Sequence, residues 1–405
     1  MNLLVSLLLS GAFAHMPLGQ FEQKAVLADA TILRQLEIPI VMEDKKLNVG
    51  LSYINPQQEQ DISKASHLLG RCGGFESLEG DSKNKVSHFE ALSSLRQAAD
   101  KEDFSHFLKE SVVLNYNAQI ADAMSEVDPA NLEATVNWLS NNFNTRYHRS
   151  QNANAHVEAL KAKILKMLEG SNLPFEVETV AHNSTPQRSL RVRLVGSEKP
   201  NEIIVLGGHL DSVVQGIFGP GPAEGRSPGS DDNASGSANI LEALRILSTK
   251  AQSKRTIEFF WYAGEEAGLL GSAEIARTYK QSNQDVIAVL QLDMSLNPGA
   301  GEMVVGNTTD FTSLWLREML QEMNRLYLNI TLQEFACGYG CSDHASWFRQ
   351  GYSTLMPFEA TMNTINRRIH TKEDVVHSGS SFNHSAVFSK IAVGFAMELG
   401  NSDRR

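Results

Sequence analysis

The sequence predicts an α/β fold in which helices cover a mostly parallel central sheet. The chain has 405 residues, of which 42% are hydrophobic, so it is long enough for one large core and a smaller unit. Beyond Phe175, short apolar runs alternate with amphipathic segments of helix length, a pattern typical of strands joined by helices. Several apolar runs end in Asp, Glu or His, and functional residues of such sheets collect at strand ends.

The expected elements follow from this alternation. Helical periodicity marks the amphipathic segments, and the apolar runs between them are assigned as strands. The expected strands are residues 190–195, 203–207, 257–262, 286–293, 303–305 and 354–358. The expected helices are residues 132–143, 155–168, 236–247, 265–279, 311–327 and 385–399. In the more irregular N-terminal part, we expect an extended pair at 38–41 and 47–54 and a helix at 62–69.

The first fourteen residues have the pattern of a secretory signal peptide. An apolar run, too short to span a bilayer, is followed by Ala12-Phe13-Ala14, which fits a small-x-small cleavage site. No positive residue precedes the run, so a buried first strand is the alternative. We expect residues 1–14 to be a signal peptide and the protein to be secreted.

Charge and cysteine content narrow the function classes. The net charge of −11, spread along the chain, argues against a nucleic-acid partner. Of the three cysteines, Cys337 and Cys341 enclose a tight Gly-Tyr-Gly turn, which favours a local disulfide. A metal site is the alternative, although no second cysteine pair is present to complete it. Cys72 is then left over.

Five segments place His, Asp or Glu at the end of an expected strand or in a loop. Each alone has an ordinary explanation: Asp-Asp-Asn as a turn or helix cap, Glu-Glu as a solvated first helical turn, and a lone His as a surface or core residue. An acid at the end of an apolar strand needs a partner, however, because burying an unpaired charge is costly. Together the five segments predict a metal centre; they are residues 207–212, 230–236, 262–266, 291–294 and 368–371.

The ligand types favour a pair of zinc ions over one. Two imidazoles and three carboxylates suit two zinc ions, and the charges of Asp231, Glu266 and Asp293 nearly balance the +4 of the pair. A nearly neutral centre can be buried without a large penalty. His209 and Asp211 are two residues apart at a strand end, so they point to the same side, where Asp211 can orient the imidazole.

From about residue 127 to 399 the chain resembles the secreted bacterial leucyl aminopeptidases, a family of exopeptidases with two catalytic zinc ions. The matching runs are Gly-Gly-His-Leu-Asp-Ser at 207–212, Asp-Asp-Asn-Ala-Ser-Gly at 231–236, Ala-Gly-Glu-Glu-Ala-Gly-Leu at 263–269, Gln-Leu-Asp-Met at 291–294, Cys-Gly-Tyr-Gly-Cys-Ser-Asp-His-Ala-Ser-Trp at 337–347 and Arg-Ile-His-Thr at 368–371. The resemblance implies a three-layer α/β/α sandwich of the zinc-exopeptidase type, with a mostly parallel mixed central sheet, preceded by a small α+β propeptide.

The resemblance also assigns roles to residues. It implies one zinc site with His209 and Asp293, a second with Glu266 and His370, and Asp231 bridging the two. It implies that Glu265 is the general base, that Tyr339 lies near the scissile carbonyl and that the peptide bond after Asp231 is cis. The implied apolar pocket for the substrate side chain consists of Met294, Cys337, Cys341, Met356, Phe358, Met362, Ile365 and Ile369.

The resemblance further implies a precursor organisation. Residues 15–107 correspond to a propeptide that restrains activity or assists folding, and residues 108–405 to the catalytic domain; a permanent accessory domain is the alternative for residues 15–107. We expect peptide and protein N-termini as substrates, no nucleic-acid or membrane partner, and a monomer. Two other functions stay open: a glutaminyl cyclase-like acyltransferase with a single zinc, and a non-enzymatic binding domain.

Overall fold

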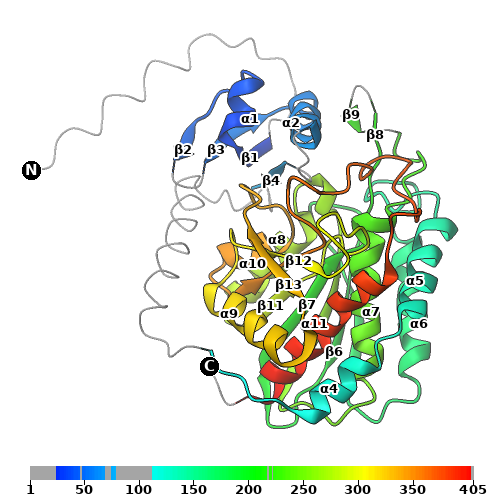
Figure 1. Cartoon of the computed structure of the whole chain (residues 1–405). Coiled ribbons are helices and arrows are strands. Elements are labelled where there is room, and N and C mark those ends of the chain that lie inside the picture. The colour runs from blue at the N-terminus through cyan, green and yellow to red at the C-terminus, as the bar shows by residue number, and fades with distance from the viewer. Residues whose placement is uncertain are drawn as a thin grey trace, which may run out of the picture.

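The computed structural model describes residues 24–45, 48–68, 74–78, 112–216, 219–220 and 222–402. These residues form a large α/β unit and a smaller N-terminal module (Figure 1). The expected signal peptide at 1–14, Cys72 and the expected boundary at residue 107 lie outside the described residues. Within the described residues, no helix is both long and apolar enough to cross a membrane.

The large unit is built on a six-stranded mixed sheet. Its strands lie in the order β14 (Thr354–Leu355), β11 (Asp285–Gln291), β7 (Lys199–His209), β10 (Arg255–Tyr262), β6 (Ser189–Leu194) and β5 (Phe175–Val180). The first four strands run parallel to one another, and β6 and β5 continue the sheet in antiparallel pairing. The mostly parallel mixed sheet predicted from the sequence is therefore confirmed.

Helices cover both faces of this sheet and make three layers. In β7, Ile204 and Leu206 face the larger core, whereas Ile203 and Val205 face the smaller core on the opposite side, as the two-residue period of a strand requires. The smaller core includes residues of α8 (Leu270–Gln281) and α10 (His344–Arg349). The larger core is covered by α4 (Ala118–Ser125), α5 (Pro129–Asn142), α6 (Ala155–Leu168), α7 (Gly236–Leu247), α9 (Leu314–Met323) and α11 (Phe382–Asn401).

Several expected elements differ from the structure: the strand expected at 354–358 is split into β14 (Thr354–Leu355) and β15 (Pro357–Phe358), and two others start later than expected. The helix expected from Glu265 begins only at Leu270, because Gly264, Gly268 and Leu269 have positive φ angles and interrupt helical geometry. The strand expected at 38–41 is β2 (Met42–Asp44) instead, which pairs with β3 (Val49–Ile54). In both places, the hydrophobic pattern marks the segment but not the residue where the regular backbone starts.

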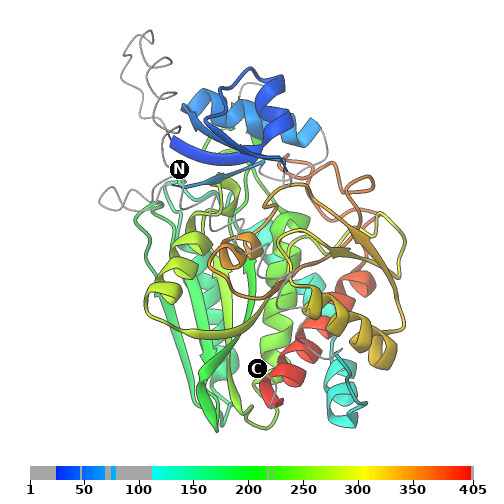
Figure 2. The ribbon, with the colours of Figure 1, turned by 90° about the vertical axis from the view of Figure 1, so that its left-hand side faces the viewer.

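The N-terminal module is a four-stranded sheet in the order β2, β3, β1 (Lys24–Asp29) and β4 (Phe75–Ser77), with helices α1 (Ala30–Gln35) and α2 (Pro56–Leu68). It has a core of its own that includes Val26, Ile32 and Ile62. Figure 2 shows the module at the end of the large unit toward which the parallel strands run. The α+β character expected for this segment agrees with the structure.

Apolar side chains and three polar contacts hold the module against the large unit. Leu27 and Leu51 of the module share a buried cluster with Leu269, Phe311 and Phe348. The polar contacts join Lys24 Nζ to Ala267 O at 3.1 Å, Ser77 N to Gly268 O at 3.2 Å, and the side chains of Glu76 and Arg349. Two of the three end on the turn that follows Glu265 and Glu266.

Two small sheets lie at the periphery of the large unit. One comprises β13 (Thr331–Phe335), β12 (Val304–Thr308) and β15 (Pro357–Phe358), and the other pairs β8 (Gln215–Gly216) with β9 (Gly219–Pro220). The first sheet carries Phe335 and Phe358, whose rings lie 5.6 Å apart at the wall of the candidate site.

Candidate functional site

The carboxyl ends of three neighbouring parallel strands bring the predicted residues together. His209 is the last residue of β7, Glu265 and Glu266 follow β10 after a short turn, and Asp293 lies two residues beyond β11. Because the parallel strands all end at the same edge, these side chains meet although they are far apart in the sequence. All four are at most 8% exposed.

Two groups of possible metal ligands lie at this edge and share one carboxylate. In the first group, His209 Nε2 lies 3.0 Å from Asp232 Oδ1 and 3.4 Å from Asp293 Oδ1. In the second, His370 Nε2 lies 2.7 Å from Asp232 Oδ2 and 2.9 Å from Glu266 Oε2. The two oxygens of Asp232 therefore face the two groups separately.

The shared residue is Asp232, which corrects the assignment of this place to Asp231. The carboxylate of Asp231 instead accepts hydrogen bonds from Leu296 N (3.0 Å), Asn297 Nδ2 (2.6 Å) and Asn366 Nδ2 (2.9 Å). It is thus already fully engaged with the neighbouring loops. The cis peptide bond is likewise one residue later than expected, between Asp232 and Asn233. Two adjacent aspartates point in different directions, and a motif alone does not say which one faces the site.

Asp374 and Asn233 fix the backbone around Asp232. The carboxylate of Asp374 accepts hydrogen bonds from the amides of Asp231 at 3.0 Å and Asp232 at 3.1 Å. The side chain of Asn233 donates to Leu292 O at 3.0 Å and accepts from Met294 N at 3.3 Å, which ties this loop to the end of β11. Neither Asp374 nor Asn233 was predicted, and only their nearness to the ligand motifs could have suggested them.

Asp211 connects the first group to the turn that carries both glutamates. Its Oδ1 lies 3.3 Å from His209 Nδ1, the imidazole that it is expected to orient. The same carboxylate accepts hydrogen bonds from the backbone amides of Glu265 at 3.0 Å and Glu266 at 3.2 Å. One buried carboxylate therefore aligns an imidazole and the start of the glutamate turn at the same time.

Glu265 occupies a site where a carboxylate is strongly perturbed. It is 3% exposed, and its Oε2 makes no hydrogen bond with any described residue. Burial raises the pKa of Glu265 well above its usual value, and although His209 opposes the shift, neighbouring carboxylates reinforce it. Burial also raises the pKa of Glu266 to about 7. Such crowding of buried acids is typical of sites that hold a cation.

The pKa values of the two histidines are also raised, but by neighbouring carboxylates and against the effect of burial. Burial would lower the pKa of His370, but Glu266 and Asp232 outweigh that effect and raise it to about 10. The pKa of His209 is likewise raised well above its usual value against the effect of burial, chiefly by Asp293. In both cases the neighbouring carboxylates favour the protonated form of the imidazole in the protein alone.

The donor set fits zinc. Each group offers one imidazole and two carboxylates, which are ligands that zinc accepts. Asp293 Oδ1 and Glu266 Oε1 are buried and accept no hydrogen bond from the described residues, although buried carboxylate oxygens normally do. Because Asp232 belongs to both groups, the site has two adjacent sets of three possible ligands.

A buried apolar cluster adjoins the two groups. The apolar cluster and the ligand groups are adjacent in the sequence, because Met294 follows Asp293 and Ile369 precedes His370. The structure brings all eight expected pocket residues into this cluster, with Tyr339, Phe335 and Ala360 in addition; the eight are Met294, Cys337, Cys341, Met356, Phe358, Met362, Ile365 and Ile369. Tyr339 is 4% exposed, and Met362 is only partly buried, at the edge of the cluster.

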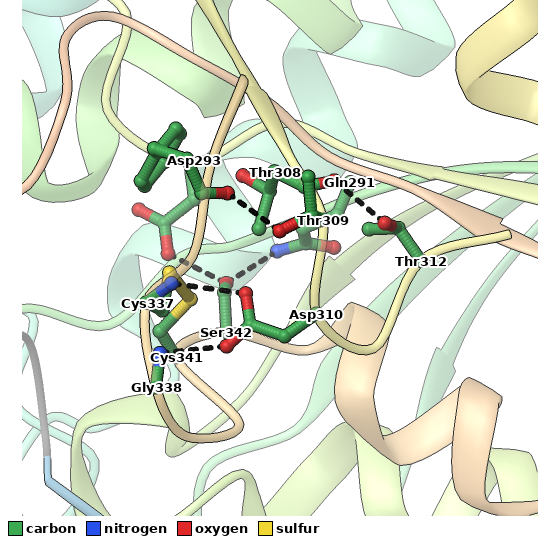
Figure 3. Close-up of a disulfide and its surroundings, with 11 residues drawn as sticks. Gln291, Asp293, Thr308, Thr309, Asp310, Thr312, Cys337, Gly338, Cys341 and Ser342 are labelled. Atoms are coloured by element: carbon green, nitrogen blue, oxygen red, sulfur yellow. Dashed lines mark hydrogen bonds between the residues drawn. A yellow bond between two sulfur atoms is a disulfide. The ribbon is translucent and has the colours of Figure 1, made fainter. Parts of the chain in front are cut away.

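The expected disulfide between Cys337 and Cys341 is present and forms part of this wall (Figure 3). The carboxylate of Asp310 accepts hydrogen bonds from the backbone amides of Cys337 at 2.9 Å and Gly338 at 2.6 Å, which fixes the start of the disulfide loop. Directly after the loop, Ser342 Oγ donates to Asp293 Oδ2 at 2.6 Å and accepts from Gln291 Nε2 at 3.0 Å. The apolar wall and a ligand carboxylate are therefore held by one short segment.

Comparisons with known proteins give a matching family and several similar proteins. Residues 190–391 match the model of peptidase family M28. A leucine aminopeptidase 1 of Aspergillus oryzae is 39% identical over 67% of this chain and 71% of its own length. A probable leucine aminopeptidase of Trichophyton verrucosum is 33% identical over 70% of this chain and 77% of its own. These relatives are fungal, whereas the resemblance had pointed to bacterial enzymes.

Solved structures share the fold. The LapA aminopeptidase of Legionella pneumophila matches with a TM-score of 0.78 at 24% identity, covering 94% of this chain and 99% of its own. LapB of the same organism matches with a TM-score of 0.76 at 23% identity. A glutaminyl cyclase of Porphyromonas gingivalis matches less well, with a TM-score of 0.51 at 16% identity over 66% of this chain. The coverage by LapA exceeds what residues 108–405 alone could give, so the shared fold includes part of the N-terminal module.

Proposed function

The chain belongs to peptidase family M28, and from that membership and the geometry of its site we propose that it is a two-zinc metallo-aminopeptidase. The observation that carries the proposal is the pair of three-ligand groups that share Asp232 beside a buried glutamate and an apolar pocket. His209 and Asp293 would hold one zinc ion, Glu266 and His370 the other, and Asp232 both.

The chemistry divides between the metal pair and the protein. When bound, a pair of zinc ions supplies an activated water molecule and polarises the peptide carbonyl. Glu265 is the general base in this proposal, because its buried Oε2 has no hydrogen-bond partner among the described residues and it adjoins the ligand Glu266. It takes the proton of the attacking water and passes it to the departing amine. Tyr339 lies in the pocket wall, from which its hydroxyl would support the scissile carbonyl.

The pocket supports a preference for large apolar N-terminal residues. Each additional buried methylene group contributes about 0.8 kcal/mol, and a leucyl side chain has three more carbon atoms than an alanyl one. Complete burial would therefore favour leucine over alanine by about 2.4 kcal/mol, or roughly 60-fold in kcat/KM. A ratio near one between the two substrates would contradict the assignment of the pocket.

We further propose that the N-terminal module is a propeptide that restrains activity. Its support is the location of the module on the turn directly after Glu265 and Glu266. Removal of the module by limited proteolysis should raise activity several-fold, whereas a permanent accessory domain would leave activity unchanged or lower. The disulfide between Cys337 and Cys341 agrees with a secreted enzyme, because such bonds persist in oxidising compartments.

The deciding experiment is the hydrolysis of leucine p-nitroanilide by the processed protein, before and after removal of metal by chelation. Activity should disappear on chelation and return with zinc, with two zinc ions bound per chain. A Glu265→Ala variant should bind zinc normally but lose at least about two orders of magnitude in kcat, the range of general-base contributions. A protein that binds one zinc and cyclises N-terminal glutaminyl peptides would establish the acyltransferase instead.

A further inference from the structure

Arg146 is a buried cation whose side chain donates its hydrogen bonds to backbone carbonyls among the described residues. It lies between α5 and α6 and is 0% exposed. Its Nε donates to Leu210 O at 2.8 Å, its Nη1 to Pro228 O at 2.6 Å, and its Nη2 to Gly229 O at 2.9 Å. A weaker contact joins Nη1 to Leu139 O at 3.4 Å. No carboxylate among the described residues lies within ion-pair distance of it.

The carbonyls that Arg146 binds belong to two of the loops that carry the site. Leu210 separates His209 from Asp211, and Pro228 and Gly229 immediately precede the loop that contains Asp232. One planar guanidinium therefore spans the end of β7 and the start of the Asp232 loop. The fork of five N–H groups suits this task, because it can bind several carbonyls in fixed directions at once.

Gln187 extends the same connection to the third loop. Its Nε2 donates to Arg146 O at 3.1 Å, and its Oε1 accepts from Gly264 N at 2.9 Å, one residue before Glu265. The Gln187 side chain is 0% exposed. The loops of His209, Asp232 and Glu265 are thus joined through residue 146, by its side chain to the first two and by its backbone to the third.

Nearby carboxylates keep the buried side chain of Arg146 positively charged. Burial lowers the pKa of Arg146 to about 10, while Asp374 and Asp211 oppose the shift, so the side chain is cationic at neutral pH. A buried cation normally pairs with a carboxylate. Here the nearby carboxylates, those of Asp374 and Asp211, lie beyond ion-pair distance. The guanidinium therefore donates its hydrogen bonds to backbone carbonyls.

We propose that Arg146 is a positioning residue that sets the relative placement of the three loops and so prepares the site for zinc. The inference rests on the proposed two-zinc function. Arg146 touches neither ligands nor substrate in this role; it acts through the backbone on either side of them. Loss of residues that orient metal ligands typically weakens metal affinity or activity 10- to 100-fold.

The test is a zinc titration of the full-length Arg146→Lys variant, in competition with a chromophoric chelator. Lysine keeps the charge but lacks the planar fork, so we expect a 10- to 100-fold weaker zinc affinity and a lower kcat at unchanged KM. The matched control is Arg226→Lys. Arg226 Nη1 also donates to backbone carbonyls, those of Ser140 at 2.6 Å and Phe143 at 3.1 Å, but these lie in and after α5 and not in the ligand loops. It should bind zinc like the wild type.

The outcomes separate a positioning role from a purely structural one. A folded Arg146→Lys variant with a lower melting temperature but wild-type zinc affinity would overturn the inference. If this variant does not fold, Gln187→Met decides. It removes the hydrogen bonds of Gln187 to Arg146 O, Gly264 N and His156 Nε2 but leaves the guanidinium of Arg146 in place. Weakened zinc affinity supports the inference, and wild-type affinity refutes it. A wild-type protein that binds two zinc ions but does not hydrolyse leucyl substrates would contradict the proposed function while the affinity test still stands. A wild-type protein that binds no zinc would refute both.

Discussion

Replacing Glu76 by Gln should loosen the N-terminal module from the large unit. The side chains of Glu76 and Arg349 are only 6% and 8% exposed, and they form an ion pair across the interface. Removing the carboxylate leaves Arg349 buried without its partner, which costs about 3–5 kcal/mol when a buried pair is broken in this way. The apolar contacts of Leu27 and Leu51 with the large unit remain. We therefore expect the equilibrium constant for undocking to rise by roughly two to three and a half orders of magnitude.

Amide hydrogen exchange at Ser77 measures this directly. The Ser77 amide donates to Gly268 O at 3.2 Å across the interface, so its exchange reports opening of the contact. Its exchange rate should rise at least about 100-fold in Glu76→Gln. Glu322→Gln is the control: it breaks the exposed pair with Arg325, which lies elsewhere, and should leave this amide unchanged.

A double variant tests whether the uncompensated charge of Arg349 is the cause of the faster exchange. Glu76→Leu combined with Arg349→Met removes both charges and replaces them by apolar groups, which is often neutral for a buried pair. The double variant should therefore exchange Ser77 far more slowly than Glu76→Gln alone. If the single variant exchanges like the wild type, or the double variant exchanges as fast as the single one, the argument from an uncompensated buried charge is wrong.

Two further predictions concern metal binding and pH. Asp232→Asn should lower the number of zinc ions bound per chain at both sites, whereas Asp231→Asn should keep two ions and lower only the melting temperature; equal zinc loss in the two variants would restore the bridging role to Asp231. Although partial burial opposes it, the imidazole of His182, whose Nδ1 lies 3.7 Å from Glu274 Oε2, and hydrogen bonds from Ser184 lower the pKa of Glu274 from 4.5 to about 2. A carboxyl group whose pKa is lowered by folding stabilises the folded state at pH values above its unfolded-state pKa. This stabilisation is lost as the pH falls toward 2. Glu274→Gln should thus reduce the free energy of unfolding by about 1 kcal/mol at pH 7, allowing for its exposure, and a denaturation series should show the difference vanishing near pH 2.

The layered architecture was predictable because burial imposes regular patterns. The helix expected at 236–247 coincides with α7. His209 is the last residue of β7 and Asp293 follows β11 by two residues, so both lie where the apolar runs end. These elements are buried on a defined face, so the hydrophobic period records their geometry. The short strand β1 was not predicted, although its residues are buried. Its partners β3 and β4 lie far along the chain, and such pairing leaves no local signal.

The candidate site was predictable in its residue types but not in its orientations. Of the six positions that the proposed function uses as metal ligands or base, five were named from motifs. For the sixth, Asp231 was named in place of its neighbour Asp232. That choice depends on hydrogen bonds from Asn297 and Asn366, which are 66 and 135 residues away in sequence. The role of Arg146 was missed for the same reason. Its side chain donates to backbone carbonyls, and because every residue has a carbonyl, the sequence does not show which ones it will contact.

The turn at 265–269 links the N-terminal module to the chemistry of the site. On one side it carries Glu265 and Glu266; on the other, the carbonyls of Ala267 and Gly268 accept hydrogen bonds from the module. Binding equilibria that meet at one element are thermodynamically reciprocal. Whatever factor the docked module applies to zinc affinity, zinc must apply to the affinity of the module. In the proposed function, zinc binding and docking of the module therefore share a single coupling energy.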